Sequence, residues 1–177
     1  MESTMEQKID RGVFRDLSYG LYLVASMDKD RFNGQVINTL IQVTSEPPRV
    51  AVIINKKNFT HELILKSKIF SASVLEESTP MTFLGPFGFR SGRDIAKLDK
   101  VAFRKGITGC PLITEHALSV LEAKVTDQVD LGTHTVFIGD IVSSEVLKEG
   151  TPITYQYYHQ VLKGKSPPNA PTYELKK

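Results

Sequence analysis

Two apolar segments separated by a double proline constrain the fold more than any other feature of the sequence. Proline has no N–H group to donate to a β-ladder, so Pro47-Pro48 must end the strand Val36–Val43 before the next strand, Arg49–Asn55, begins. Each strand leads into small polar residues, at Gln42–Ser45 and at Asn55–Thr60. Polar clusters of this kind can bind a planar heteroaromatic ring on one side and a phosphate on the other.

Short strand patterns also dominate the rest of the chain. Apolar runs predict strands at Leu21–Met27, Phe70–Leu75, Leu118–Val129 and His134–Val146, and weaker periodic patterns predict short helices at Ile9–Leu17, His61–Ser67 and Thr79–Phe87. Strands joined by hairpins and brief connections favour a mainly β fold with short helices, either an antiparallel barrel or a sandwich.

Four local signals refine this prediction. The Asn33-Gly34 pair suits the turn of a hairpin whose second strand is Val36–Val43. Thr60 is expected to cap the helix that follows it, and a shift in the apolar phase at Val120-Leu121 predicts a β-bulge. Residues 163–177 contain several prolines and are expected to form an extended tail that lies on a partner subunit.

Composition limits the class of protein. The 177 residues suit a single domain, 1–177, with its core at about 13–146. The net charge of +2 is scattered without a Lys/Arg block, which argues against nucleic-acid binding. The longest apolar run, Val50–Ile54, is too short to cross a membrane, and the N-terminus lacks a signal-peptide pattern. Cys110 is the only cysteine, which favours a reducing, cytoplasmic location.

Several catalytic and nucleotide-binding motifs are absent from the sequence. It contains no GxGxxG that opens a long helix, no GxxxxGK[ST], no HExxH and no GxSxG. A Rossmann site, a P-loop, a zinc site and a hydrolase nucleophile elbow are therefore not expected, and no metal site is predicted. Redox chemistry would need a bound organic cofactor, because no side chain in this chain accepts a hydride.

The polar strand ends have two interpretations. In the structural one, Thr44 and Ser45 close a strand, Thr60 caps a helix and Lys56-Lys57 form a solvated turn. In the functional one, N–H groups and hydroxyls at the first strand end face a heteroaromatic ring, and the second strand end offers a cation and a helix N-terminus to a phosphate. Composition and spacing alone favour the structural interpretation, because polar strand ends are common.

One ordered series of motifs extends over most of the chain. The run Gly20–Ser26 is followed by Asn33-Gly34, Asn38-Thr39, Gln42-Val43-Thr44, Pro47-Pro48, Asn55-Lys56-x-Asn58-x-Thr60-His61, Phe89–Asp94 and Gly132-Thr133-His134-Thr135-x-Phe137-x-Gly139-Asp140. In this order and spacing the chain resembles the flavin reductase-like family, especially the branch with flavoredoxin and the flavin reductase domain of high-molecular-weight rubredoxin. The resemblance implies an antiparallel Greek-key split β-barrel, a homodimer, FMN near the subunit interface and NAD(P)H as co-substrate.

The resemblance also implies roles for individual residues. Carried over by position, Thr39, Gln42, Val43, Thr44 and Ser45 would line the flavin ring, Asn55, Lys56, Asn58 and Thr60 would hold the ribityl chain and phosphate, and Arg90 and Ser91 would contribute from a loop. His134, in Gly-Thr-His where the family has a Gly-Asp-His-like motif, would face the nicotinamide, whereas taken alone a histidine after a hairpin turn is more often a surface residue. Cys110 is expected to be structural, because no neighbouring base activates its thiol.

Three functions remain to be distinguished. The first is an FMN-dependent oxidoreductase that transfers a hydride from NAD(P)H to flavin and passes electrons to free flavin, a protein acceptor or dioxygen. The second is a flavoredoxin-like electron carrier that protein partners reduce, and the third is a non-redox flavin-binding module. Some fused relatives carry a rubredoxin domain, whose iron needs several thiolates; with Cys110 alone, this chain would use a separate rubredoxin.

Overall fold

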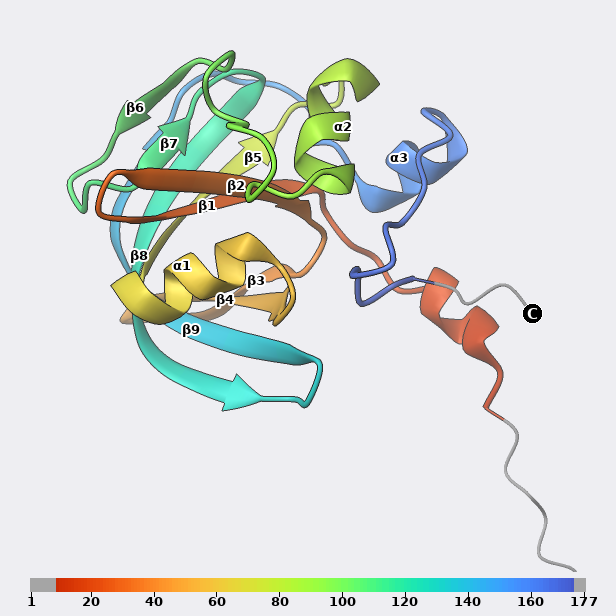
Figure 1. The fold of residues 1–177 in the computed structure, drawn as a ribbon. Coiled ribbons are helices and arrows are strands. Elements are labelled where there is room, and N and C mark those ends of the chain that lie inside the picture. Colours follow the sequence, from red (N-terminus) through yellow and green to blue (C-terminus); the bar gives the residue numbers. More distant parts are fainter. Residues whose placement is uncertain (1–8, 174–177) are drawn as a thin grey trace, which may run out of the picture.

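The computed structural model describes residues 9–173 (Figure 1). The strands are β1 (Tyr22–Asp28), β2 (Arg31–Ile37), β3 (Leu40–Ser45), β4 (Pro48–Asn55), β5 (Ile69–Leu75), β6 (Phe103–Lys105), β7 (Pro111–Ile113), β8 (Ala117–Asp130) and β9 (His134–Val146). The α-helices are α1 (Phe59–Ser67), α2 (Met81–Phe89) and α3 (Tyr155–Gln160), and a 3-10 helix covers Arg11–Arg15.

The main sheet has seven strands in the order β2-β1-β5-β8-β9-β4-β3, and each neighbouring pair is antiparallel. Its two edge strands, β2 and β3, are consecutive in the chain and are separated only by Asn38 and Thr39. The sheet must therefore curl until its edges approach each other at this link, yet no ladder joins the two edges. The result is an antiparallel barrel that is open along one seam, as the sequence predicts.

Apolar residues pack on both faces of the central strands. Val24 of β1 contacts one cluster with Val52 and Phe70, whereas the adjacent Leu23 contacts a second cluster that includes Phe87 of α2. The first cluster fills the barrel, and the second lies between the sheet and helices α2 and α3. Alternate residues of β1 are buried on opposite faces, so helices must cover the outside of the barrel at this point.

The predicted strand Val36–Val43 is wrong as one element. The structure divides it at Asn38-Thr39, where the chain leaves the β2 edge of the sheet and enters the β3 edge. At the link, the Thr39 hydroxyl donates to the Ile53 carbonyl at 2.9 Å, and the Ile53 N–H donates back to the Thr39 carbonyl at 3.1 Å. An apolar run continues through the change of edge, so the pattern alone does not reveal it.

The predicted Asn33-Gly34 turn is also wrong. The β1–β2 hairpin turns at Lys29-Asp30, with Lys29 at a positive φ of 55°, and Gly34 pairs with Ala25 inside the ladder. A side chain at position 34 would place its Cβ 2.9 Å from the Leu23 side chain, so glycine serves close packing here. Asn33 is a buried residue of β2 that faces α1.

Two smaller predictions change in detail, while the predicted contact of the tail with a partner subunit stays a prediction. Asn58, not Thr60, is the N-cap of α1, and Thr60 is buried inside the first turn. The bulges of β8 against β9 lie at Glu122/Ala123 and Val125/Asp127, the first of them directly after the predicted Val120-Leu121. The described part of the tail, 163–173, contacts its own chain.

Candidate flavin site

A cavity of about 450 Å³ lies at the seam where the two edges of the sheet meet. This volume is in the range of pockets that hold small molecules. Its walls come from the end of β2, the Asn38-Thr39 link, β4, the start of α1, the end of α2, the loop after α2, α3 and the tail. Polar lining residues are Asn33, Gln35, Asn38, Thr39, Asn55, Lys57, Asn58, Arg90, Ser91, Asp94, Lys97, Tyr155, Tyr158, Lys165, Ser166, Asn169 and Thr172.

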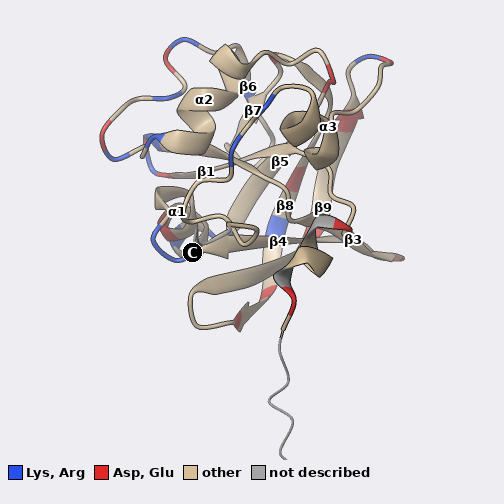
Figure 2. Cartoon of the chain, turned by 90° about the vertical axis from the view of Figure 1, so that its right-hand side faces the viewer, with Lys and Arg blue, Asp and Glu red and all other residues tan. Residues whose placement is uncertain are grey.

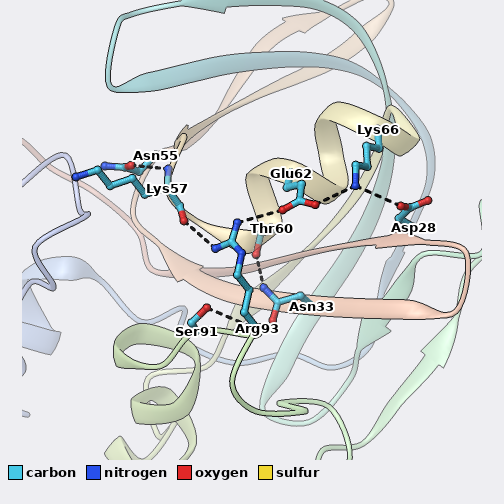
Figure 3. A network of polar contacts seen from close by, with 9 residues as sticks. All are labelled: Asp28, Asn33, Asn55, Lys57, Thr60, Glu62, Lys66, Ser91 and Arg93. Carbon is cyan, nitrogen blue, oxygen red and sulfur yellow. Dashed lines mark hydrogen bonds and ion pairs between the residues drawn. The ribbon is translucent and has the colours of Figure 1, made fainter.

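The N-terminus of α1 forms a polar end of this cavity (Figure 3). The Lys57 N–H donates to the Asn55 carboxamide oxygen at 2.9 Å, which fixes the turn before the helix. Arg93, from the loop after α2, donates to the Lys57 carbonyl at 3.0 Å and to Glu62 of α1 at 3.1 Å. Unpaired N–H groups and positive charge at a helix start favour an anion such as a phosphate.

The Glu62 carboxylate is held between two cations. It accepts hydrogen bonds from Lys66 at 2.9 Å and from Arg93 at 3.1 Å, and these bonds lower the pKa of Glu62. Glu62 thereby fixes Arg93, and Arg93 fixes the loop beside the helix start. This network positions the Arg90–Ser91 segment on the cavity wall.

The β2 wall carries buried amides. Asn33 donates to the Thr60 hydroxyl at 2.8 Å, which ties β2 to α1. The side-chain oxygens of Asn33 and Gln35 are buried and accept no hydrogen bond from the described residues. Gly92 packs on Asn33 so closely that a Cβ there would lie 1.9 Å from the amide oxygen. The Gln35 oxygen likewise has no donor, and a buried acceptor without a donor is costly unless a ligand supplies one.

Lys97 is the buried cation of the cavity. Its residue is 8% exposed, its Nζ donates to the Gly34 carbonyl at 3.1 Å, and Nζ lies 6.0 Å from the centre of the Phe87 ring. No ion pair joins it to a carboxylate within the described chain. Burial lowers the pKa of Lys97 to about 8.

The tail closes one side of the cavity. Asn169 donates to the Asn58 side-chain oxygen at 3.1 Å, which explains why the Asn58 side chain does not cap α1. The Asn38 amide donates to the Thr172 hydroxyl at 3.4 Å, and the Tyr158 hydroxyl donates to the Lys165 carbonyl at 3.0 Å. The tail therefore contacts both the helix start and the β2–β3 link.

The structure brings together five of the residues predicted to contact flavin. They are Thr39, Asn55, Asn58, Arg90 and Ser91, which all line the cavity. Lys56 and Thr60 lie outside its lining: Lys56 forms an ion pair with Asp130 at 2.6 Å, which lowers the pKa of Asp130, and Thr60 is held by Asn33.

The ring-contact residues Gln42, Val43, Thr44 and Ser45 lie on the edge strand β3, away from the cavity lining. The Thr44 hydroxyl donates to the Pro47 carbonyl at 2.5 Å, and Gln42 donates to the Thr44 carbonyl at 3.4 Å. Ile41 and Val43 are 61% and 45% exposed on the same strand. This strand therefore presents apolar side chains at an uncovered sheet edge.

His134 begins β9 and pairs with Asn55 across the sheet, outside the cavity lining. Its Nδ1 lies 2.8 Å from the Thr133 hydroxyl, and its Nε2 is buried without a partner among the described residues. Nearby, His61 Nε2 lies 2.8 Å from the Thr135 hydroxyl. Burial, then the charge of Lys56, lowers the pKa of His61.

The single cysteine of the chain is a structural residue. Cys110 is fully buried, and burial raises the pKa of its thiol to about 12, as expected for an inert cysteine.

Within residues 9–173, no cluster of three His, Cys, Asp or Glu could hold a metal ion. In the same range, no helix is both long and apolar enough to cross a membrane. Charged residues are spread over the loops and helices around the barrel (Figure 2).

Sequence reasoning missed Gln35, Lys97 and the tail as parts of the cavity. One signal was available for the first of these: Asn33 and Gln35 are polar at alternate positions of a strand whose neighbours are buried. Lys97 and the tail carry no local pattern, because only the folded chain brings them to the seam.

Comparison with known proteins agrees with this geometry. Residues 14–164 match the model of the flavin reductase like domain. The chain is 47% identical to a ferric-chelate reductase (NAD(P)H) from Archaeoglobus fulgidus over 93% of this chain and 98% of the relative, and 45% identical to high molecular weight rubredoxin from Moorella thermoacetica over 94% and 73%.

A solved FMN-binding protein from Thermus thermophilus superposes with a TM-score of 0.71 at 27% identity, covering 82% of this chain and 80% of that one. The split-barrel fold predicted from the sequence is thus confirmed. The match over most of the length shows that the chain belongs to the flavin reductase-like family.

Proposed function

We propose that this protein is an FMN-dependent oxidoreductase that takes a hydride from NAD(P)H and passes the electrons to flavin, a protein acceptor or dioxygen. The observation that carries the proposal is the cavity at the seam, with a helix start suited to an anion at one end and two buried amide oxygens without donors on its β2 wall. Family membership and the NAD(P)H-dependent relative support the same reaction.

The residues present fit FMN. Its phosphate would lie at the start of α1, where backbone N–H groups are joined by Lys57, Asn58, Arg90 and Ser91. Its ribityl hydroxyls would form hydrogen bonds with side-chain amides of the lining, such as that of Asn55. Its ring would pack against apolar side chains of the lining, such as Phe87. When bound, the flavin supplies the hydride acceptor that no side chain provides.

The chain's own contribution is position and electrostatics. Arg93 and Glu62 hold the loop and helix start that would grip the phosphate. The tail, through Asn169, would limit escape of the cofactor and access of water. His134 is proposed to face the nicotinamide ring of NAD(P)H.

A homodimer is part of the proposal. The exposed edge strand β3, with Ile41 and Val43, would form the subunit contact, because an uncovered apolar edge favours association. In such a dimer Gln42–Ser45 and Lys56 would approach the cofactor of the partner subunit or its substrate.

An electron-carrier function is the second candidate. The relative high molecular weight rubredoxin is longer than the aligned region, which covers 73% of it. Its name supports a separate rubredoxin as an electron acceptor for this chain. In the carrier, protein partners rather than NAD(P)H would reduce the flavin.

Anaerobic titration of FMN-loaded protein with NADH and with NADPH tests the proposal. The flavin absorbance band should bleach with one equivalent of at least one nucleotide. Bleaching only by a reduced protein partner would favour the carrier, and protein that fails to bind FMN would contradict both.

A further inference from the structure

We propose that an acidic electron-acceptor protein docks on a basic strip of the surface, formed by Arg90, Lys100 and Lys105 between the cavity and β6. The partner is a small one-electron redox protein with negative charge around its own cofactor. The inference rests on the proposed function, in which electrons leave the cavity for an acceptor, and it names the surface that the acceptor contacts.

Positive charge is concentrated in one stretch of the chain. Residues 90–105 contain six Lys or Arg against two Asp, a net charge of +4, whereas all other residues together have a net charge of −2. The basic residues of this stretch are interrupted by other residues, so the asymmetry emerges only when charge is counted by segment. In the fold the stretch runs from the end of α2 to β6 (Figure 1).

The basic strip consists of the cations of this stretch that lack a counter-charge. Arg90, Lys100 and Lys105 are exposed and form no ion pair with a carboxylate within residues 9–173. The two other exposed cations of the stretch are neutralised by Glu62 and Glu145. Like charges held together without counter-charges attract an anionic partner and accelerate its encounter with this surface.

Exposed aromatic rings accompany the charge. Phe89 is 50% exposed at the end of α2, and Phe103 is 36% exposed in β6. The Phe103 ring lies 6.1 Å from the ring of Phe32, and the Lys105 Nζ lies 5.2 Å from the centre of that same Phe32 ring. Protein interfaces are enriched in aromatic side chains, and transient electron-transfer complexes need only a small contact. Charge and aromatic surface together fit a protein better than a free inorganic anion.

The strip is continuous with the cavity, because Phe89 and Arg90 both line it. An acceptor docked on the strip would therefore lie beside the reduced cofactor. Two oxidised acceptor molecules would each take one electron, and the two protons of the reduced cofactor would pass to water. Negative charge around the acceptor's own cofactor would place that cofactor toward the cavity.

Lys100→Glu/Lys105→Glu in the full chain tests the strip, because neither residue lines the cavity. The probe is an oxidised rubredoxin with a net negative charge, mixed with FMN-loaded protein that has been reduced by one equivalent of dithionite. At low ionic strength the second-order rate constant for rubredoxin reduction should be at least about tenfold lower than for the wild-type protein. The two rate constants should converge as added salt screens the charges.

Two further double variants serve as controls. Lys124→Glu/Lys163→Glu makes the same change in net charge at exposed positions outside residues 90–105 and should keep the wild-type rate constant. Lys100→Gln/Lys105→Gln removes the charges without reversing them and should give an intermediate value. FMN affinity and the rate of flavin reduction by NAD(P)H should be unchanged in all three variants.

Association of the flavin-free protein with rubredoxin gives a readout that needs no cofactor. Isothermal titration calorimetry at low salt should show binding to the wild-type protein that is at least about tenfold weaker in Lys100→Glu/Lys105→Glu. An unchanged rate constant and affinity in this variant, or an equal loss in Lys124→Glu/Lys163→Glu, would overturn the inference. Binding of single-stranded DNA in place of rubredoxin would overturn it as well.

Failure of the inference and failure of the proposed function give different results. Flavin that bleaches with NADH or NADPH in a protein that does not associate with rubredoxin overturns the inference alone. Association that depends on Lys100 and Lys105, in a protein whose flavin neither nucleotide bleaches, supports the strip and contradicts the NAD(P)H-dependent reaction.

Discussion

At the residue scale, the cavity holds polar groups that the described chain does not pair. The buried Gln35 Oε1 receives no hydrogen bond, and the buried Lys97 ammonium donates to the Gly34 carbonyl but pairs with no carboxylate. Natural proteins are only marginally stable, so such groups are retained where they serve a ligand. The stability of the flavin-free protein should reflect this cost.

The burial of Lys97 predicts a pH-dependent stability. Its pKa is lowered to about 8 from the ordinary 10.5, so between these pH values the unfolded chain binds more protons than the folded chain, and stability rises with pH. Relative to Lys97→Met, the wild-type free energy of unfolding should gain roughly 1–3 kcal/mol over this range. Urea unfolding of the flavin-free proteins measures it.

Other titratable groups on the cavity wall are shared by the wild-type protein and the variant and cancel in this comparison. They are Lys57, Arg90, Asp94, Tyr155, Tyr158 and Lys165. Stability curves that remain parallel from pH 8 to 10.5 would show that the ammonium is not destabilised by burial.

Arg90→Ala tests the phosphate end of the cavity. A lost charge-assisted hydrogen bond should weaken FMN binding about tenfold and leave riboflavin binding unchanged. Fluorescence titration measures both affinities, with Arg104→Ala, whose side chain pairs with Glu145, as the control. Equal weakening for both flavins would contradict a phosphate contact.

His134→Ala tests the nicotinamide side. Because His134 lies outside the cavity lining, FMN affinity should stay nearly intact while oxidation of NADH or NADPH becomes slower. Stopped-flow measurement of flavin reduction gives the rate. Identical rates in the variant and the wild-type protein would remove the assigned role.

At the scale of elements, the connection between β2 and α1 supports the cavity. Thr60→Val keeps the shape of the side chain but leaves the buried Asn33 amide without its acceptor, so the free energy of unfolding should fall by about 1–3 kcal/mol. Thr82→Val, at an exposed position of α2, is the matched control. Urea unfolding that shows equal stability for both variants would contradict a structural role for this bond.

The elements also show what a sequence pattern can predict. β4, β5 and the β8–β9 hairpin follow from apolar runs between turn signals. The division of Val36–Val43 does not, because the run stays apolar while the chain passes from one sheet edge to the other. The family resemblance pointed to Thr39 and Asn55, which line the cavity, whereas the place of Lys97 on its wall depends on long-range packing.

At the scale of the whole molecule, the seam of the barrel and the tail together define the cavity. β2 and β3 form opposite edges of the sheet on either side of the Asn38-Thr39 link, and residues of α2, α3 and the tail line the cavity there. In Figure 1 these three segments lie on the same side of the barrel. The tail is the part of this wall that is held mainly by side-chain hydrogen bonds, such as Asn169 to Asn58.

Removal of the tail should therefore loosen the cofactor. A chain that ends at Gly164 should release FMN at least about tenfold faster, since it loses the wall formed by 165–172 while the barrel core remains. Transfer of flavin to an excess of a second flavin-binding protein measures the release rate. Asn169→Ala should show a smaller increase, and an unchanged rate in the shortened chain would contradict a retaining role.

A crystal structure of the full chain grown with FMN tests the central claim most directly. The account predicts the phosphate at the start of α1 and the ring in the cavity at the seam. A ring bound on the exposed face of β3, with the cavity filled by side chains, would contradict it.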